Sequence, residues 1–384
     1  MQTIMTESPN LRSDAFDALV RDLVGPLADE VDRAGRFPRE GIRALGEAGL
    51  LGLLSARENG GAGAGLREAA QVIERLAGAC GSTAMVLLMH YSAVTVLDRH
   101  APDDVRREIA AGRHLTTLAF SERGSRSHFW APVSTAEPQG ADAVRLDAQK
   151  SWVTAAGEAD SYVWSSRPLR ADGPMSLWLV PAGSAGLEVQ GDYDGFGLRG
   201  NASSPVSATA VSVPRSALLA ADGEGLNTAL EVVLPCFLVL SAAFSLGVTE
   251  ALLGLTAEHL RNTRLAHLDR TLAQQPMTRN QFAGLRLRAD ALRALLEETL
   301  TATETGRPEA TLRILQIKAL AAETAAEVAD GAMRLCGGAA FRRETGVERR
   351  FRDALAARVM APTTEALHDF CGRVELGLPL FEKA

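Results

Sequence analysis

The spacing of apolar residues changes twice along this chain, and that change limits its possible folds more than any other feature. From residue 11 to about residue 112 apolar side chains recur at helical spacing, as at Leu19 and Leu23. From residue 115 to about residue 213 short β-rich runs, separated by Gly, Pro, Asp and Ser, replace that pattern. From Gly223 onward long helical segments return. The helices expected there span residues 224–262, 278–305, 308–335 and 353–375.

These changes divide the chain of 384 residues into three expected domains. We expect an N-terminal helical domain over residues 1–113, a central antiparallel, barrel-like β-domain over 114–222, and a C-terminal four-helix bundle over 223–384. The expected fold class is therefore α+β. A chain of this length can bury a large core in several domains.

Charge and cysteine content narrow the partners. The formal net charge of −7 argues against nucleic acid, because binding of phosphate needs a basic surface. The cysteines, Cys80, Cys236, Cys336 and Cys371, form no CxxC pair and lie in apolar helical stretches. We therefore expect buried free thiols, with neither a disulfide nor a metal site.

No segment has the pattern of a targeting signal or a membrane anchor. Residues 1–19 carry acidic side chains and lack the apolar stretch of a secretory signal. The most apolar window, Val232–Val248, contains Pro235 and is about as long as the shortest membrane spans. We interpret it as a buried bundle helix, and we expect a cytoplasmic protein with no membrane partner.

Five short segments carry the motifs on which a family resemblance rests, and some of them have residues that could contact a flat cofactor. An aromatic ring such as that of Trp152 can pack on a planar ring system, and a hydroxyl such as that of Thr154 can bond to its polar rim. Paired glycines let a ligand approach the backbone closely. The segments are LAFSERGSRS at residues 118–127, QKSWVTAA at 149–156, GFGLRG at 195–200, RLCGG at 334–338 and RD at 352–353.

In order and spacing these segments resemble the acyl-CoA dehydrogenase family over nearly the whole chain. LAFSERGSRS resembles the family's C-x-T-E-P-x-A-G-S, with Ser121 at the Thr and Ser127 at the last Ser. Arg123 and Arg126 replace the Pro and the second Gly of that pattern. QKSWVTAA resembles G-x-K-x-W-I-T-N, and the other three segments resemble M-G-x-R-G, Q-x-x-G-G and R-D.

The resemblance implies a bound FAD whose ring lies against the first two segments. It also implies a homodimer or homotetramer in which Gly337 and Gly338 approach a neighbouring subunit's FAD. The family's pyrophosphate Arg lies in R-x-x-F-G; here Arg264 is the first choice and Arg270 the second, and the missing Phe-Gly leaves FMN open. The implied cofactor-binding residues are Phe120, Ser121, Ser127, Trp152, Thr154, Arg264, Gly337, Gly338 and Thr363.

The sequence departs from the family at the catalytic base. Most members place a Glu in Y-E-G-T, eight residues after the Asp of R-D, where it removes the substrate's α-proton. That position is Ala361 here, followed by Pro362 and Thr363, and alanine cannot accept a proton. A minority of members place the base on the first bundle helix, where this chain has Phe237.

Two titratable residues near these positions remain candidates for a base. Glu365 lies four residues after Ala361, which on a continuous helix is one turn along the same face. His128 follows Ser127 in the segment that the family uses to contact substrate. The residues expected to contact substrate are Ser127, His128, Phe237 and Ala361. The sequence leaves the catalytic residue unidentified.

Three functions remain open. The first is FAD-dependent α,β-dehydrogenation of a small acyl substrate carried by CoA or a carrier protein. The second is a flavin monooxygenase or oxidase, which the missing Glu favours, as does the lack of any charge from Pro235 to Gly247 that could hold a CoA phosphate. The third is a non-catalytic flavin-bound protein that binds nucleic acid or another protein, and the acidic net charge argues against it.

Overall fold

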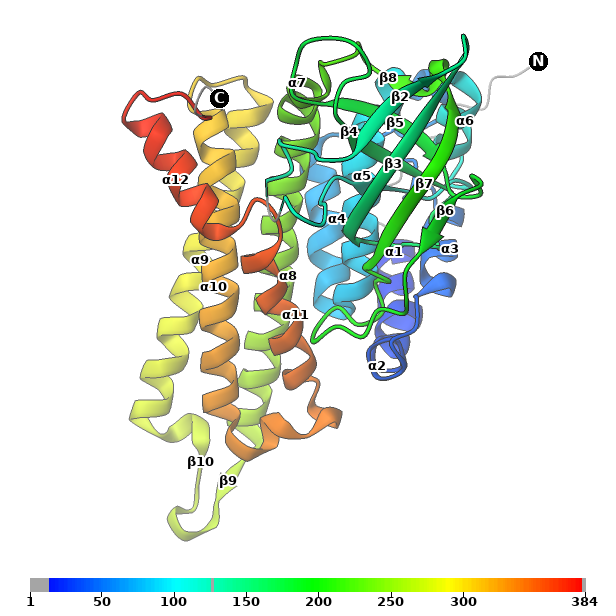
Figure 1. Cartoon of the computed structure of the whole chain (residues 1–384). Coiled ribbons are helices and arrows are strands. Elements are labelled where there is room, and N and C mark those ends of the chain that lie inside the picture. The colour runs from blue at the N-terminus through cyan, green and yellow to red at the C-terminus, as the bar shows by residue number, and fades with distance from the viewer. Residues whose placement is uncertain (1–13, 126–127, 382–384) are drawn as a thin grey trace, which may run out of the picture. The chain divides into compact units, whose positions relative to one another are not determined.

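The computed structural model, drawn in Figure 1, describes residues 14–125 and 128–381. It contains two compact units, and each is described by itself. In the described part, the first unit holds residues 14–72, 82–195 and 199–237, and the second holds 73–81, 196–198 and 238–381. The boundaries of the three expected domains stay a prediction.

The helices of the first unit form because apolar side chains repeat at helical spacing on one face. In α3, for example, Ile42 and Leu45 are buried while Arg39 and Arg43 lie on the surface. Helix α5 is buried on almost every side, which its apolar sequence requires. The N-terminal elements are α1 (Asp14–Leu19), the π-helical turn η1 (Val20–Val24), α2 (Gly25–Ala34), α3 (Arg39–Glu47), α4 (Leu66–Ala79), α5 (Gly81–His100) and α6 (Asp103–Ala110).

The strands of the first unit form two four-stranded sheets. Their orders are β1-β4-β5-β8 and β2-β3-β7-β6. The pairs are antiparallel except β1 with β4, which is parallel, so the expectation of a purely antiparallel domain is corrected at that pair. The strands are β1 (Thr116–Ala119), β2 (Thr135–Gln139), β3 (Ala143–Val153), β4 (Ser161–Ser166), β5 (Ser176–Pro181), β6 (Leu187–Val189), β7 (Ser204–Pro214) and β8 (Leu218–Leu219).

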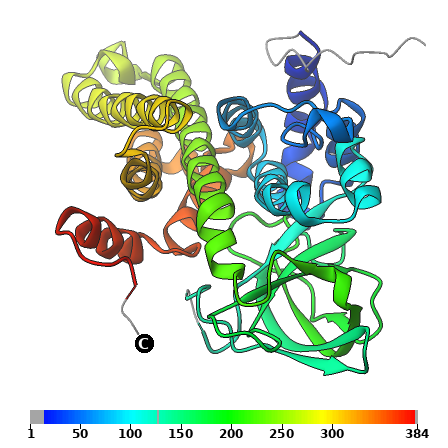
Figure 2. The ribbon, with the colours of Figure 1, turned by 90° about the horizontal axis from the view of Figure 1, so that it is seen from above.

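Large aromatic side chains fill the core of this β region. Tyr162 and Trp164 of β4 and Trp178 of β5 are fully buried and pack with Leu146 and Val206 from the other sheet. In Figure 2 these strands gather beside the blue N-terminal helices of the same unit. The sheets therefore form a rigid support for the loops and strand ends that carry the first two sequence segments.

The second unit is a helical bundle with α10 at its centre. Helix α10 packs against α9, α11 and α12, and most of its residues are buried because small alanines line its length. The elements here are α8 (Leu234–Asn262, from Leu238 onward), the ribbon β9 (Arg264–Leu265) and β10 (Arg270–Thr271), α9 (Pro276–Glu304), α10 (Ala310–Cys336), α11 (Val347–Val359) and α12 (Thr364–Glu375).

The helix expected over residues 353–375 is wrong as a single element. The structure has two helices there, α11 and α12, separated at residues 360–363. The peptide bond Ala361–Pro362 is cis. Proline has no backbone N–H and disfavours helical geometry at the residue before it, so a helix seldom runs through such a position. Position 361 therefore lies in a break between helices and not on a helix face.

One continuous helical segment, Gly225–Asn262, is long and apolar enough to cross a membrane. It comprises α7 (Gly225–Thr228), the π-helical turn η4 (Ala229–Val233) and α8. Its most apolar window has a mean hydropathy of 2.2 and is 89% buried. Burial inside the protein accounts for this composition, as the sequence interpretation expected.

Candidate functional site

The first two segments, far apart in the sequence, lie side by side in the first unit. The chain leaving β1 pairs with the end of β3 through an antiparallel bridge between Glu122 and Lys150. Ser151 donates its backbone N–H to the Ser121 carbonyl at 3.0 Å, and Arg123 donates to the Gln149 carbonyl at 2.9 Å. The two segments therefore form one short strip of sheet.

Trp152 turns outward at the end of this strip. The pairing of β3 with β7 shifts register between Lys150 and Val153, and Trp152 has a φ of +55°. A bulge of this kind re-aims a side chain that would otherwise point into the sheet. The indole is 71% exposed, so it presents a large flat apolar face to its surroundings.

Thr154 differs from Trp152 in its surroundings. It is buried, and its hydroxyl lies 3.1 Å from the hydroxyl of Ser203. The next amide, of Ala155, donates to the Asn201 carbonyl at 2.9 Å. The hydroxyl of Thr154 thus has a partner within the protein, and its expected bond to a cofactor would have to share or replace that contact.

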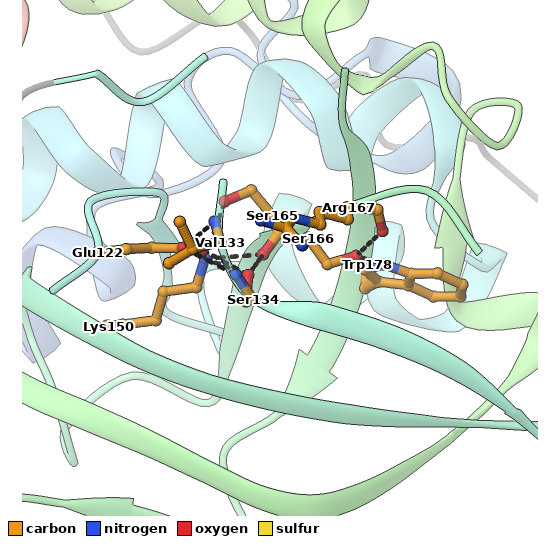
Figure 3. Close-up of polar contacts among 8 residues, drawn as sticks. All are labelled: Glu122, Val133, Ser134, Lys150, Ser165, Ser166, Arg167 and Trp178. Atoms are coloured by element: carbon orange, nitrogen blue, oxygen red, sulfur yellow. Dashed lines mark hydrogen bonds and ion pairs between the residues drawn. The ribbon is translucent and has the colours of Figure 1, made fainter. Parts of the chain in front are cut away.

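A buried ion pair lies beneath the strip (Figure 3). The side chains of Lys150 and Glu122 are 0% and 1% exposed and contact each other directly. The Glu122 carboxylate also accepts from the backbone N–H groups of Val133 at 2.6 Å and Ser134 at 3.0 Å. The Lys150 ammonium donates to the carbonyl of Ser165 at 2.7 Å and to its hydroxyl at 2.9 Å. The pair therefore joins the end of β1, the start of β2, β3 and β4.

Burial and pairing act against each other on these two groups. Burial lowers the pKa of Lys150 to about 8, although the Glu122 carboxylate opposes that shift. Burial alone would raise the pKa of Glu122, but the Lys150 ammonium and the hydrogen bonds hold it below its usual range. Both groups are therefore charged at neutral pH.

The other predicted residues of the first segment divide into buried and exposed ones. Phe120 is buried and Ser121 is half-buried. His128 is exposed, with its Nδ1 at 3.1 Å from the Ser125 carbonyl and its ring edge-on to Trp130. Ser127 and its neighbour Arg126 lie outside the described residues.

A pocket of about 340 Å³ opens in the first unit near the start of α8. Apolar side chains make much of its lining, and Cys236 also lines it. The polar and charged lining residues are Thr95, Asp98, Arg99 and Glu231. Burial raises the pKa of the Cys236 thiol to about 12, which keeps it protonated and inert. Phe237, the next residue, is buried, and neither residue offers a carboxylate.

In the second unit the paired glycines end helix α10. Gly337 has a φ of +56° and a ψ of −139°, a conformation that only glycine adopts easily. A methyl group added at Gly337 or at Gly338 would meet no atom within 4 Å. The backbone at these two positions is therefore open to a ligand, and Phe341 just beyond is exposed.

The arginines predicted to hold the pyrophosphate lie in the β9–β10 ribbon. Arg264 pairs with Asp269 of the same ribbon, so its charge is already balanced. Arg270, the second choice, is exposed and has no ion pair within residues 14–125 and 128–381. By this measure Arg270 is the more available anion ligand of the two.

The third and fifth segments meet in the second unit. Asp353 accepts from the Leu198 backbone N–H at 2.7 Å, and Arg352 donates to the Phe196 carbonyl at 3.1 Å. A Cβ at Gly197 would lie 2.5 Å from the Arg352 carbonyl oxygen, so the close approach requires glycine there. The RD segment is therefore a structural clasp for the 196–198 turn.

Lys318 holds the break that contains Ala361. Lys318 is only 1% exposed. Its ammonium donates hydrogen bonds to the carbonyls of Ala357 at 2.9 Å, Met360 at 2.9 Å and Pro362 at 2.7 Å. Burial lowers the pKa of Lys318 to about 7, against the opposing charge of Glu365. All three N–H donors of the ammonium are used, so the protonated group has none left for a ligand.

Glu365 does not take the place that the sequence suggested. Helix α12 begins at Thr364, and the Thr363 hydroxyl accepts from the Ala366 backbone N–H as its N-cap. Since Ala361 precedes this helix, the expected one-turn relation between Ala361 and Glu365 is wrong. The carboxylate is exposed, and its own backbone N–H and the Thr363 hydroxyl hold its pKa below the usual range, which makes it a weaker base.

The residues in the first unit fit a flavin ring. The exposed indole of Trp152 offers a planar apolar face, and an isoalloxazine can stack on such a face. In the second unit, the open backbone at Gly337 and Gly338 leaves room for close approach by a ligand such as a phosphate or ribose. These residues would hold the cofactor.

Sequence reasoning missed three of the charged groups that organise these segments: Glu122, Lys150 and Lys318. A signal for two of them was present, because only three of the 40 basic residues are lysines. The two described lysines, Lys150 and Lys318, are both fully buried, whereas arginine supplies the surface cations. A rare lysine in an arginine-rich chain thus pointed to a compact buried ammonium.

Comparison with known proteins gives consistent matches along the chain. The acyl-CoA dehydrogenase N-terminal, middle and C-terminal domain families match residues 6–112, 117–211 and 223–376. A cyclohex-1-ene-1-carbonyl-CoA dehydrogenase of Geobacter metallireducens is 25% identical over 384 residues, which cover 97% of this chain and 99% of that one.

Two solved structures share the fold at lower identity. A glutaryl-coenzyme A dehydrogenase in complex with glutaryl-CoA superposes with a TM-score of 0.90 at 21% identity and covers 100% of this chain and 98% of that one. FMN-bound TdsC of Paenibacillus sp. A11-2 superposes with a TM-score of 0.85 at 20% identity, covering 96% and 99%.

Proposed function

The chain belongs to the acyl-CoA dehydrogenase family, and we propose that it is an FAD-dependent oxidoreductase that oxidises a small acyl thioester between its α- and β-carbons. The observation that carries the proposal is the joined strip of Ser121–Arg123 and Gln149–Ser151, with Trp152 turned outward beside it. The relative from Geobacter metallireducens acts, by its name, on a CoA thioester.

The chain's own residues bind and orient the two reactants. Trp152 offers its face to the flavin ring, and the half-buried Ser121 and Ser151 lie on the same strip. Gly337 and Gly338 leave room for the cofactor of a neighbouring subunit. When bound, FAD supplies the acceptor for the two electrons that leave the substrate. We propose that the pocket near Cys236 receives the acyl chain, because its lining is largely apolar.

Proton removal at the α-carbon finds no base at the positions where the family places one. Ala361 has no basic atom, Glu365 is an exposed carboxylate on the next helix, and the Lys318 ammonium is saturated by three carbonyls. A positioned base contributes about 10²–10⁴-fold. We therefore propose that the natural substrate carries an α-proton more acidic than that of a simple saturated acyl thioester.

The test has two stages. The purified protein is denatured, and the released flavin is identified against FAD and FMN standards. The holoenzyme is then mixed anaerobically with a panel of acyl-CoAs, in which the α-proton acidity varies, while the flavin absorbance is followed. Bleaching that increases with α-proton acidity supports the proposal; a protein that neither retains nor binds a flavin contradicts it.

A second function, flavin-dependent monooxygenation or oxidation, is favoured by one specific observation. The position of the family's Glu is Ala361, and Pro235–Gly247 carries no charge that could hold a CoA phosphate. Oxygen uptake coupled to substrate, with reduced flavin supplied, selects this function; anaerobic bleaching by acyl thioesters selects the first. We also propose a homodimer or homotetramer, because Gly337 and Gly338 match a segment that in the family approaches a neighbour's cofactor.

A further inference from the structure

We propose that the buried Glu122–Lys150 ion pair is a positioning element for the flavin, which fixes the chain after β1 against the end of β3. Loss of the pair should then weaken flavin binding even when both sheets remain folded. This inference rests on the proposed function, because the ligand it positions is the flavin. It assigns a role to two residues that contact no cofactor themselves.

The geometry places the pair directly behind the proposed flavin surface. Glu122 and Lys150 are bridge partners, and their side chains point inward, where they are almost fully buried. Side chains alternate across a strand, so the neighbours Ser121 and Ser151 belong to the opposite side of the strip. Trp152 follows one residue later, at the bulge. A shift of the pair thus moves the surface residues on both segments.

The pair also draws in elements beyond the two segments. Glu122 accepts two backbone N–H groups and the hydroxyl of Ser134 at the start of β2. Lys150 reaches the carbonyl and hydroxyl of Ser165 in β4. These partners lie at the start of β2 and in β4 (Figure 3), which belong to different sheets, so the two charges fix the strip against both sheets.

Stability alone does not explain such a pair. Removing two charges from water is expensive, and replacing a buried ion pair with apolar residues is often neutral or stabilising. The best-documented role of buried polar or ionic groups is to fix one geometry or register of the chain. The choice of lysine in a chain that otherwise uses arginine agrees with this, since a compact ammonium fits among three acceptors where a planar guanidinium does not.

The experiment separates positioning from folding. The variants are Glu122→Gln, Lys150→Met and the double variant, with Arg145→Gln as a matched control that breaks the exposed Arg145–Glu137 pair on the same strand. Each is measured for the urea midpoint of the flavin-free protein, the FAD dissociation constant by fluorescence titration, and the position of the flavin absorption bands.

We expect each single variant to lower the midpoint, because it leaves one buried charge without its partner. In the double variant we expect the midpoint to recover while the FAD dissociation constant stays raised by about tenfold or more, with shifted flavin bands, as loss of charged hydrogen bonds implies. The control should match wild type in all three measurements.

The inference is overturned if the double variant folds and binds FAD with the wild-type dissociation constant and spectrum. If the double variant does not fold, Ser134→Ala decides: it removes one hydroxyl that bonds to Glu122, and an unchanged dissociation constant and spectrum would again overturn the inference. Failure of the wild type to bind any flavin is a separate result, and it contradicts the proposed function instead.

Discussion

Replacing Lys318 with methionine removes the group that holds the break between α11 and α12. Methionine matches the length of the lysine stem but offers no donor to the carbonyls of Ala357, Met360 and Pro362. The last carbonyls of a helix have no intrahelical partner, and a buried carbonyl left unpaired costs about 1–3 kcal/mol. Burying the ammonium is itself unfavourable, and its removal offsets part of that loss. We expect a net destabilisation of about 2–4 kcal/mol at neutral pH.

The pH dependence gives this prediction a definite sign. The pKa of Lys318 is 10.5 when exposed and about 7 in the folded protein. Between these values the unfolded state binds more protons than the folded state, so the free energy of unfolding rises with pH. The rise is at most about 1.4 kcal/mol per pH unit for one group. The Met variant lacks the part due to Lys318, so its deficit should grow by roughly 3 kcal/mol between pH 6 and pH 9.

Urea denaturation followed by far-UV circular dichroism at pH 6 and pH 9 measures both quantities. Lys150 titrates in the same direction in wild type and variant, so it cancels in their difference. Glu327→Gln is the control on the same helix, since Glu327 forms an exposed pair with Arg288 and should cost at most about 1 kcal/mol at either pH. A deficit that is absent at both pH values would refute the role assigned to Lys318, and a deficit that does not grow with pH would refute the lowered pKa.

Two further predictions concern the flavin and the missing base. Trp152→Ala should weaken FAD binding more than Thr154→Ala. A stacked aromatic is worth about 3–5 kcal/mol when fully buried, whereas the Thr154 hydroxyl is worth about 1 kcal/mol and already contacts Ser203. Equal dissociation constants in fluorescence titration would place this loop away from the flavin. Ala361→Glu should speed anaerobic flavin reduction by acyl-CoAs in a stopped-flow experiment. The gain should be smaller than the roughly 10²–10⁴-fold of a well-placed base, because Pro362 directly follows the new carboxylate. Fast reduction by the wild type would show that another residue is the base.

Much of the fold could be predicted from the spacing of apolar residues that are close in the sequence. The change from helical spacing to short β runs near residue 115, and back near Gly223, matches the observed elements closely. The segments around Trp152 and Gly337 were found because their order and spacing resemble those of the family. The changes in apolar spacing are local, so a single sequence is enough to read them.

What escaped prediction depends on contacts between distant residues or on backbone atoms. The acceptors of Lys318 are three backbone carbonyls. Every residue has a backbone carbonyl, so the sequence cannot identify these acceptors. The break at residues 360–363 was hidden because Pro362 was considered only as a substitution within a motif, although it also ends a helix. The outward turn of Trp152 arises from a bulge, which is set by the pairing of two strands and not by either strand alone.

Buried polar groups hold the backbone around Ala361. Lys318 fixes the carbonyls on both sides of Ala361, and Asp353 anchors α11 through the Leu198 amide. A chain that had lost any use for this position would gain nothing from a buried ammonium there, since burying the charge is costly. The backbone at position 361 is thus held in place although its side chain supplies no base.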